Sequence, residues 1–342
     1  MRSGQTSARV SRRRLFAGLV LAPLAALVAP WLARAQALDG LDAATWLDLD
    51  WVDGTRQRPV PVRLHLPAQS VEQGIAPAPA PAPLVVFSHG IGGSRRGYSY
   101  LGRHFAQHGI ASLHLQHVGS DRSLWGGSVF GLAGRLANAA QDGEATARVH
   151  DLKFALDTLL ASKLAPRVDA SRIVAAGHSY GANTALLASG ARVSRNGQVI
   201  ELRDERVRAA IVISAPPFYG DRNPQAVLAP VTVPSLHITA TEDIIRIPGY
   251  YSGADDRVAV FEATGSARKW LAVFEGGSHS MFTDRAGTGG PVLNLQVKAA
   301  TKALSLAFVR TVFGGDDGAL RAWPQQHAGI LSQFRAPEGV KA

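Results

Sequence analysis

The sequence of 342 residues contains no cysteine. The chain can therefore form no disulfide bond and no thiolate metal site, and covalent chemistry must use an oxygen or nitrogen nucleophile. Charged residues make up 18% of the chain and hydrophobic residues 46%. These fractions are ordinary for a soluble globular protein and allow a sizeable core without cross-links.

Acidic residues are absent from the first 37 positions, which hold six arginines. This segment supplies more than half of the formal net charge of +10, because the rest of the chain holds 30 basic and 26 acidic residues. No basic run interleaved with aromatic residues follows position 37. We therefore expect no nucleic-acid partner.

Residues 1–37 have the order of a secretory signal peptide, with a basic start, an apolar run over 15–32 and then the cleavage motif ARA. The stretch SRRRLF at 11–16 resembles the twin-arginine signal of bacterial exported proteins, which sends a folded protein across the membrane. We expect cleavage after Ala35 or Ala37 and a periplasmic or secreted protein.

An uncleaved membrane anchor is the alternative interpretation of the apolar run. Pro23 and Pro30 interrupt that run, and the cleavage motif follows it directly. No later segment is apolar enough to span a bilayer, so we expect no stable membrane insertion after cleavage.

Residues 38–342 are predicted to form a single α/β domain. Stretches 45–52 and 60–66 alternate apolar and polar residues around an Asp-Gly pair, which predicts an antiparallel hairpin of two edge strands. The alanine–proline stretch 75–83 has no side chains to bury and is predicted to be a surface loop.

Short, unalternating apolar runs then alternate with helix-length segments. This rhythm predicts a mostly parallel central sheet with helices on both faces. The predicted strands are 84–88, 110–115, 173–176, 209–214, 235–239 and 270–274, and the clearest predicted helices are 98–108 and 149–160.

The segment 118–147 breaks this rhythm. It is rich in glycine and other small residues and follows the predicted strand 110–115. Loops after the carboxyl ends of parallel strands surround the ligand site in open sheets, so we interpret this segment as a short cap insertion.

The pentad GHSYG at 177–181 fits the pattern G-x-S-x-G, with Ser179 at its centre. A predicted strand precedes it and a helix of small residues follows it, which is the setting of a sharp strand-to-helix turn. Glycine at both ends removes the side chains that would collide there. The turn also places Ser179 at a helix N-terminus, where unpaired N–H groups stabilise negative charge.

A serine hydroxyl needs a base to take its proton, and the base needs an acid to hold its tautomer. His279 is the predicted base, in a flexible loop after the strand 270–274, and Asp243 is the predicted acid, directly after the strand 235–239. Other acids in loops could also reach the site, namely Glu242, Asp221, Asp255 and Asp256. Asp243 is preferred because it alone directly follows a central strand in the required order.

The stretch HGIGG at 89–93 follows the predicted strand 84–88. Its glycines allow backbone N–H groups to approach a substrate oxygen. We predict that the N–H groups of Ile91 and Tyr180 form an oxyanion hole.

With these parts in order, the sequence resembles the α/β-hydrolase superfamily over about residues 45–315, and within it the bacterial predicted dienelactone-hydrolase group, which is related to platelet-activating-factor acetylhydrolases. The stretches that carry this likeness are VVFSHGIGGSRRGYSYLGRHFAQHGI, LQHVGSD, VHDLKFALDTLL, GHSYGANTAL, ITATED and FEGGSHSMF. The resemblance implies carboxylic-ester hydrolysis. Dienelactone hydrolases proper use a cysteine nucleophile, which this chain lacks.

Other histidines compete for roles. We expect His178 to pack inside the turn and His89 to support the glycine loop through a backbone hydrogen bond. Two histidine pairs, His104 with His108 and His114 with His117, could suggest metal sites, but no carboxylate joins them at helical spacing. Some aromatic residues could line an acyl pocket or fill the core: Trp125, Phe130, Phe218, Tyr219 and Phe282.

The sequence thus predicts an exported serine hydrolase that cleaves carboxylic esters through an acyl-enzyme, with no cofactor or metal. No charged cluster is evident for an anionic group, which favours a small or medium apolar acyl ester. Acyl transfer and peptidase action by the same residues are alternatives, as is a noncatalytic binding protein on this fold. The oligomeric state is not predicted.

Overall fold

The computed structural model describes residues 45–68, 80–247, 250–286 and 288–337. The predicted signal peptide, 1–37, and most of the alanine–proline stretch lie outside these residues. Among the described helices, none is both long enough and apolar enough to cross a membrane.

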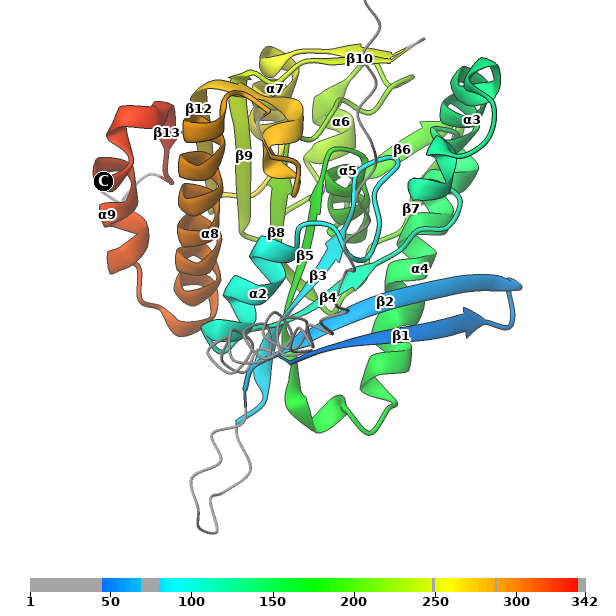
Figure 1. The fold of residues 1–342 in the computed structure, drawn as a ribbon, viewed down its shortest axis with the longest axis horizontal. Coiled ribbons are helices and arrows are strands. Elements are labelled where there is room, and N and C mark those ends of the chain that lie inside the picture. Colours follow the sequence, from blue (N-terminus) through cyan, green and yellow to red (C-terminus); the bar gives the residue numbers. More distant parts are fainter. Residues whose placement is uncertain (1–44, 69–79, 248–249, 287, 338–342) are drawn as a thin grey trace, which may run out of the picture. The chain divides into compact units, whose positions relative to one another are not determined.

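A mixed sheet forms the centre of the described chain (Figure 1). Its nine strands lie in the order β1 (Thr45–Asp53), β2 (Arg58–Leu66), β4 (Ala111–Leu115), β3 (Ala82–Ser88), β5 (Val168–His178), β8 (Val207–Ile213), β9 (Ser235–Glu242), β12 (Lys269–Ser278) and β13 (Leu331–Arg335). The strands from β4 to β12 run parallel, whereas β1, β2 and β13 pair antiparallel with their neighbours. The prediction of a mostly parallel sheet is confirmed.

The strands are buried on both faces, which explains their unalternating apolar sequence. In β3, Leu84 and Val86 belong to one core, while Val85 and Phe87 belong to the other. The first core is covered by α4 (Asp142–Leu160), α5 (Tyr180–Ala188), α6 (Pro224–Leu228) and α7 (Ala254–Ala263), and the second by α2 (Ser99–Gln107), α8 (Pro291–Gly314) and α9 (Gly318–Gln326). Each fully buried leucine or valine contributes about 1.5–3 kcal/mol to this packing.

The N-terminal hairpin forms as predicted, with Thr45 opposite Leu66 and Asp53 opposite Arg58. The prediction that both of its strands lie at an edge is wrong for β2, because β2 also pairs with β4. The edges of the described sheet are β1 and β13.

Three further pairings involve strands that were not predicted. The first is β13 against β12. The others are two small hairpins, β6 (Arg192–Arg195) with β7 (Gln198–Glu201) and β10 (Ile245–Ile247) with β11 (Tyr250–Ser252). Asn196 and Gly197 turn the first hairpin with φ of 52° and 75°, and such an Asn-Gly pair is a signal that the sequence does contain.

The segment 118–147 holds two short 3-10 helices, η2 (Arg122–Trp125) and η3 (Val129–Gly131), and then α3 (Leu132–Ala139). Its last residues already belong to α4, which begins at Asp142 and is longer than the predicted helix 149–160. The indole N–H of Trp125 donates to the carbonyl oxygen of Gly92 at 2.8 Å. This hydrogen bond connects the segment 118–147 to the loop 89–93.

Candidate active site

Ser179 occupies a strained turn between β5 and α5. Its backbone has φ of 56° and ψ of −125°, a conformation that residues with a side chain seldom adopt and that clusters at functional sites. A Cβ on Gly177 would collide with the carbonyl group of Gly181, and one on Gly181 would collide with that of Ser88. Both glycines are therefore required by close backbone packing, as the sequence predicts.

The loop 89–93 packs against this turn. A Cβ on Gly90 would lie 3.2 Å from Cβ of Ser179. Within the described chain, the backbone N–H groups of Ile91 and Tyr180 make no hydrogen bond. Both remain available to a bound oxygen atom.

Asp243 and His279 lie after β9 and β12, which are neighbours in the sheet. Nδ1 of His279 donates to Oδ1 of Asp243 at 2.6 Å, and the hydroxyl of Thr239 donates to Oδ2 at 2.8 Å. His279 begins a short 3-10 helix, η5 (His279–Phe282), in place of the predicted flexible loop.

Asp243 is completely buried. Burial alone would raise the pKa of its carboxyl group, but the hydrogen bond from His279 and the charge of Arg257 outweigh burial and hold the pKa well below its ordinary value. Arg257, on α7, is itself buried and donates to Oδ1 at 3.4 Å. Asp243 therefore stays ionised in the folded protein.

Within the described chain, none of the competing acids bonds His279. Asp221 pairs with Arg195 at 2.5 Å. Asp256 accepts the N–H of Gly253 at 2.8 Å, so the predicted loop acids Asp255 and Asp256 lie in the first turn of α7. Glu242 is exposed. Of the five acids considered as partners of the predicted catalytic base, Asp243 is the one that bonds His279 in the structure.

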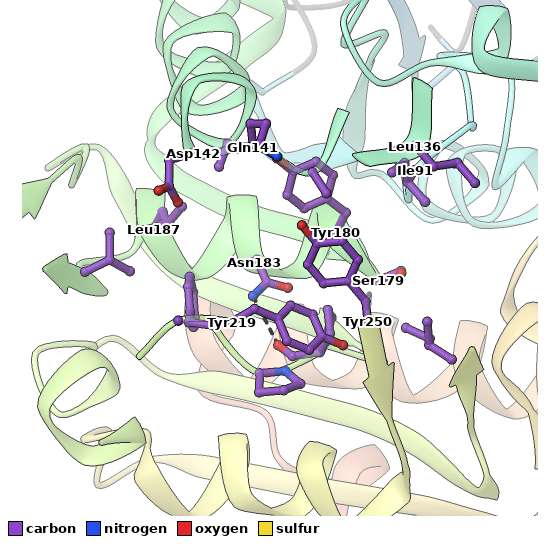
Figure 2. Close-up of a pocket in the computed structure, with 18 of the residues that line it drawn as sticks. Ile91, Leu136, Gln141, Asp142, Ser179, Tyr180, Asn183, Leu187, Tyr219 and Tyr250 are labelled. Carbon is purple, nitrogen blue, oxygen red and sulfur yellow. Dashed lines mark hydrogen bonds between the residues drawn. The ribbon is translucent and has the colours of Figure 1, made fainter. Parts of the chain in front are cut away.

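Two cavities meet at Ser179. One, here called the apolar cavity, has a volume of about 380 Å³ and extends between α3, α5 and the loop after β8. Figure 2 shows its lining residues, with Ile91 and Leu136 at one end and Leu187 at the other. The other has a volume of about 500 Å³ and includes His279. Within the described residues, the Ser179 hydroxyl and His279 line the second cavity together without a hydrogen bond between them.

The predicted aromatic residues lie in four different places. Phe218 and Tyr219 line the apolar cavity, and Trp125 lines the second cavity. Phe282 is fully buried in the core, whereas Phe130 is 96% exposed.

His178 connects the base to the glycine loop. Its Nε2 donates to the carbonyl oxygen of His279 at 3.0 Å, and its Nδ1 accepts from the hydroxyl of Tyr98 at 2.8 Å. The same hydroxyl accepts the N–H of Gly90 at 3.3 Å. Burial lowers the pKa of His178 to about 3, which keeps this chain of hydrogen bonds neutral.

His89 supports the glycine loop as predicted, through a hydrogen bond from Nδ1 to the carbonyl oxygen of Gly90 at 2.7 Å. Its own carbonyl oxygen accepts from Arg148. Arg148 is fully buried on α4 and also donates to the hydroxyl oxygens of Thr184 and Ser120, at 2.9 and 2.7 Å. Sequence reasoning missed Arg148 because an arginine on a helix is ordinarily exposed.

A second serine–histidine–aspartate chain lies beneath the site. His117 bonds Ser88 through Nε2 and Asp151 through Nδ1, both at 3.0 Å. All three residues are fully buried, so no substrate can reach them. These hydrogen bonds connect the end of β3 to α4. They give both ring nitrogens of His117 a protein partner, so its burial is explained without a metal.

Comparison with known proteins identifies the family. A model described as "Alpha/beta hydrolase family" matches residues 85–340, and one described as "Platelet-activating factor acetylhydrolase, isoform II" matches residues 4–126. No curated protein sequence matches the chain. The chain belongs to the α/β-hydrolase family, as its sequence predicts.

Solved structures agree with this fold. The ferulic acid esterase from Streptomyces cinnamoneus has a TM-score of 0.56 at 23% identity, over 80% of this chain and 91% of that one. A puromycin hydrolase mutant complexed with PGG has a TM-score of 0.54 at 16% identity, over 79% of this chain. This chain spans 40% of the length of that puromycin hydrolase.

Proposed function

We propose that this protein is an exported serine hydrolase that cleaves carboxylic esters, with Ser179 as nucleophile, His279 as general base and Asp243 as the acid that orients His279. The observation that carries this proposal is the 2.6 Å bond between His279 and buried Asp243, beside a serine held on a strained turn in the same cavity. The hydrogen bond to Asp243 keeps the proton on Nδ1, so Nε2 is unprotonated and free to act as a base.

In the first half-reaction, His279 takes the proton of Ser179 as Oγ forms a bond to the ester carbonyl carbon. The carbonyl oxygen becomes an oxyanion, which the N–H groups of Ile91 and Tyr180 stabilise. His279 then gives the proton to the alcohol oxygen as the carbon–oxygen bond breaks, and the alcohol leaves.

In the second half-reaction, water gives a proton to His279 and its oxygen bonds to the acyl carbon. The bond to Ser179 breaks as the proton returns to Oγ, which releases the carboxylic acid and restores the enzyme. Every proton in this scheme passes through His279.

Ester cleavage is supported by the acetylhydrolase family model, although its match ends at residue 126, before Ser179. Export is supported by the order of the segment 1–37 and its consecutive arginines Arg12, Arg13 and Arg14. The export proposal predicts that replacing Arg12 and Arg13 by lysine retains the precursor inside the cell. Cell fractionation and the mass of the released protein test it.

The hydrolase proposal is tested with p-nitrophenyl esters of increasing acyl length and the purified mature protein. Ser179→Ala should lower kcat by at least about 10⁴-fold. Ser171→Ala is the matched control, because Ser171 lies on the same strand and is exposed. Equal activity of wild type and Ser179→Ala would refute the proposal, as would failure of a fluorophosphonate to label Ser179 in a protein inert to all esters.

A further inference from the structure

The second cavity at Ser179 is lined by three arginines and is here called the arginine cavity. Arg122 comes from η2, Arg246 from β10 and Arg285 from the chain after η5. Asp284 also lines it, and its carboxylate accepts the N–H of Ser99 at 3.0 Å. Positive side chains therefore outnumber negative ones by three to one around this cavity.

The three guanidinium groups are uncompensated within the described part of the chain. None of them forms an ion pair there or donates a hydrogen bond to another described residue. Arg195 in the apolar cavity is different, because it pairs with Asp142 at 2.9 Å and with Asp221 at 2.5 Å. One cavity thus presents free positive charge, while the charge in the other is neutralised.

The position of His279 decides which part of an ester enters which cavity. Under the proposed function, His279 must reach the alcohol oxygen in order to protonate it as it leaves. His279 lines the arginine cavity and is absent from the lining of the apolar cavity. The alcohol part therefore lies among the arginines, and the acyl part lies in the apolar cavity.

We infer that the arginine cavity makes the enzyme selective for esters whose alcohol carries an anionic group, such as a carboxylate, sulfonate or phosphate. This inference rests on the proposed function. A guanidinium group binds the oxygens of such an anion through paired hydrogen bonds, and two or three of them can share one anion. The sequence alone showed no charged cluster for an anionic group, and the convergence of these arginines revises that expectation. The predicted apolar acyl group is kept.

The test compares two butyrate esters that differ in the charge of the alcohol, those of 3-hydroxybenzoate and of 3-hydroxybenzamide. The wild-type protein should cleave the anionic ester with a kcat/KM at least about tenfold higher. Because the arginines are exposed, this preference should decrease as the salt concentration rises from about 20 to about 500 mM.

Substitution of the arginines tests whether they cause the preference for the anionic ester. Arg246→Gln combined with Arg122→Gln should lower the ratio of the two kcat/KM values to near one. Arg321→Gln is the control and should keep the ratio, since Arg321 is an exposed residue of α9 that pairs with Asp317. A ratio that persists in the double variant would overturn the assignment of these arginines.

A wild-type ratio near one, with Ser179-dependent cleavage of both esters, would overturn the inference and leave the hydrolase proposal standing. If neither ester is cleaved, the result counts against the hydrolase proposal. The affinity of the arginine cavity for an anion then tests the inference separately. Benzenesulfonate should then bind at least about tenfold more tightly than benzenesulfonamide, and the double variant should lose that difference. Equal binding of the two compounds would refute the inference.

Discussion

The guanidinium group of Arg148 lies 4.5 Å from the centre of the Tyr180 ring and donates a hydrogen bond to the carbonyl oxygen of His89. Tyr180 carries one of the proposed oxyanion donors, and His89 begins the loop that carries the other. A single buried side chain therefore holds both backbone segments in place. Burial lowers the pKa of Arg148 to about 10, so the group remains charged at neutral pH.

Replacing Arg148 by methionine should weaken both stability and turnover. The hydrogen bonds to His89, Ser120 and Thr184 would be lost in a dry environment, which predicts a decrease of about 3 kcal/mol in the free energy of unfolding. The oxyanion donors would also be less well placed, so kcat should fall by at least about tenfold while KM changes little.

Urea unfolding and steady-state kinetics measure the two effects of Arg148→Met. Arg148→Lys keeps the charge but not the three-way hydrogen bonding, so it should recover only part of kcat. If Arg148→Met loses stability and keeps the wild-type kcat, Arg148 has a purely structural role.

Stability should decrease as the pH falls below about 6.5. Burial lowers the pKa of His65 and His117 to about 4, and that of His178 and His237 to about 3. The unfolded chain binds these protons near its ordinary pKa of about 6.5, whereas the folded chain does not. The stabilisation is therefore complete above about pH 6.5 and is lost as the pH falls toward 4, by about 1 kcal/mol per histidine per pH unit.

Urea unfolding at about pH 7, 6 and 5 measures this slope. His237→Gln should reduce it, because His237 is buried and its described hydrogen bond is to Ser235, at 3.2 Å, and not to Asp243 or His279. Equal free energies of unfolding at all three pH values would contradict the prediction.

Gly177→Ala should prevent normal folding or lower stability by more than about 3 kcal/mol. The added methyl group would collide with the backbone of Gly181, which cannot move without opening the turn at Ser179. Gly134→Ala is the control, because a Cβ there meets nothing within 4 Å in α3. It should increase stability by about 0.5–1 kcal/mol, and thermal unfolding of both variants checks the contrast.

Ala145→Phe should shorten the acyl chain that the enzyme accepts. Ala145 lies on α4 and lines the apolar cavity. A phenyl ring there should lower kcat/KM for octanoyl esters by about tenfold and leave acetyl esters nearly unchanged. Ala133→Phe, at an exposed position of α3, should change neither, and an unaltered chain-length profile in Ala145→Phe would place the acyl group elsewhere.

The central strands could be predicted because each is a short apolar run buried on both faces. β13 could not be predicted in this way, because LSQFR at an edge has few apolar residues and owes its pairing to β12. The start of α4 was also missed, since Gly143 and the polar residues around it conceal the helical pattern. Local sequence thus predicts the central strands of this sheet better than its edge strand or the ends of its helices.

The predicted site residues come together because each follows a parallel strand, and parallel strands end at one edge of the sheet. The residues that sequence reasoning missed have no such signal. Arg148 and Arg257 are single helical residues whose burial depends on distant segments. The arginines of the second cavity come from three separate parts of the chain, so their convergence is visible only in three dimensions.

The two cavities share only Ile91, Ser179 and Ile245 among their described lining residues. Acid and alcohol preferences can therefore be altered by separate sets of substitutions, with little interference between the sets. A protein engineer could vary Leu136, Leu187 and Tyr219 in one library and Arg122 and Arg246 in another, and then combine the best members of each. Under the proposed function, Ser179 serves both cavities, so specificity for the acyl part and for the alcohol part of an ester can be changed in separate steps.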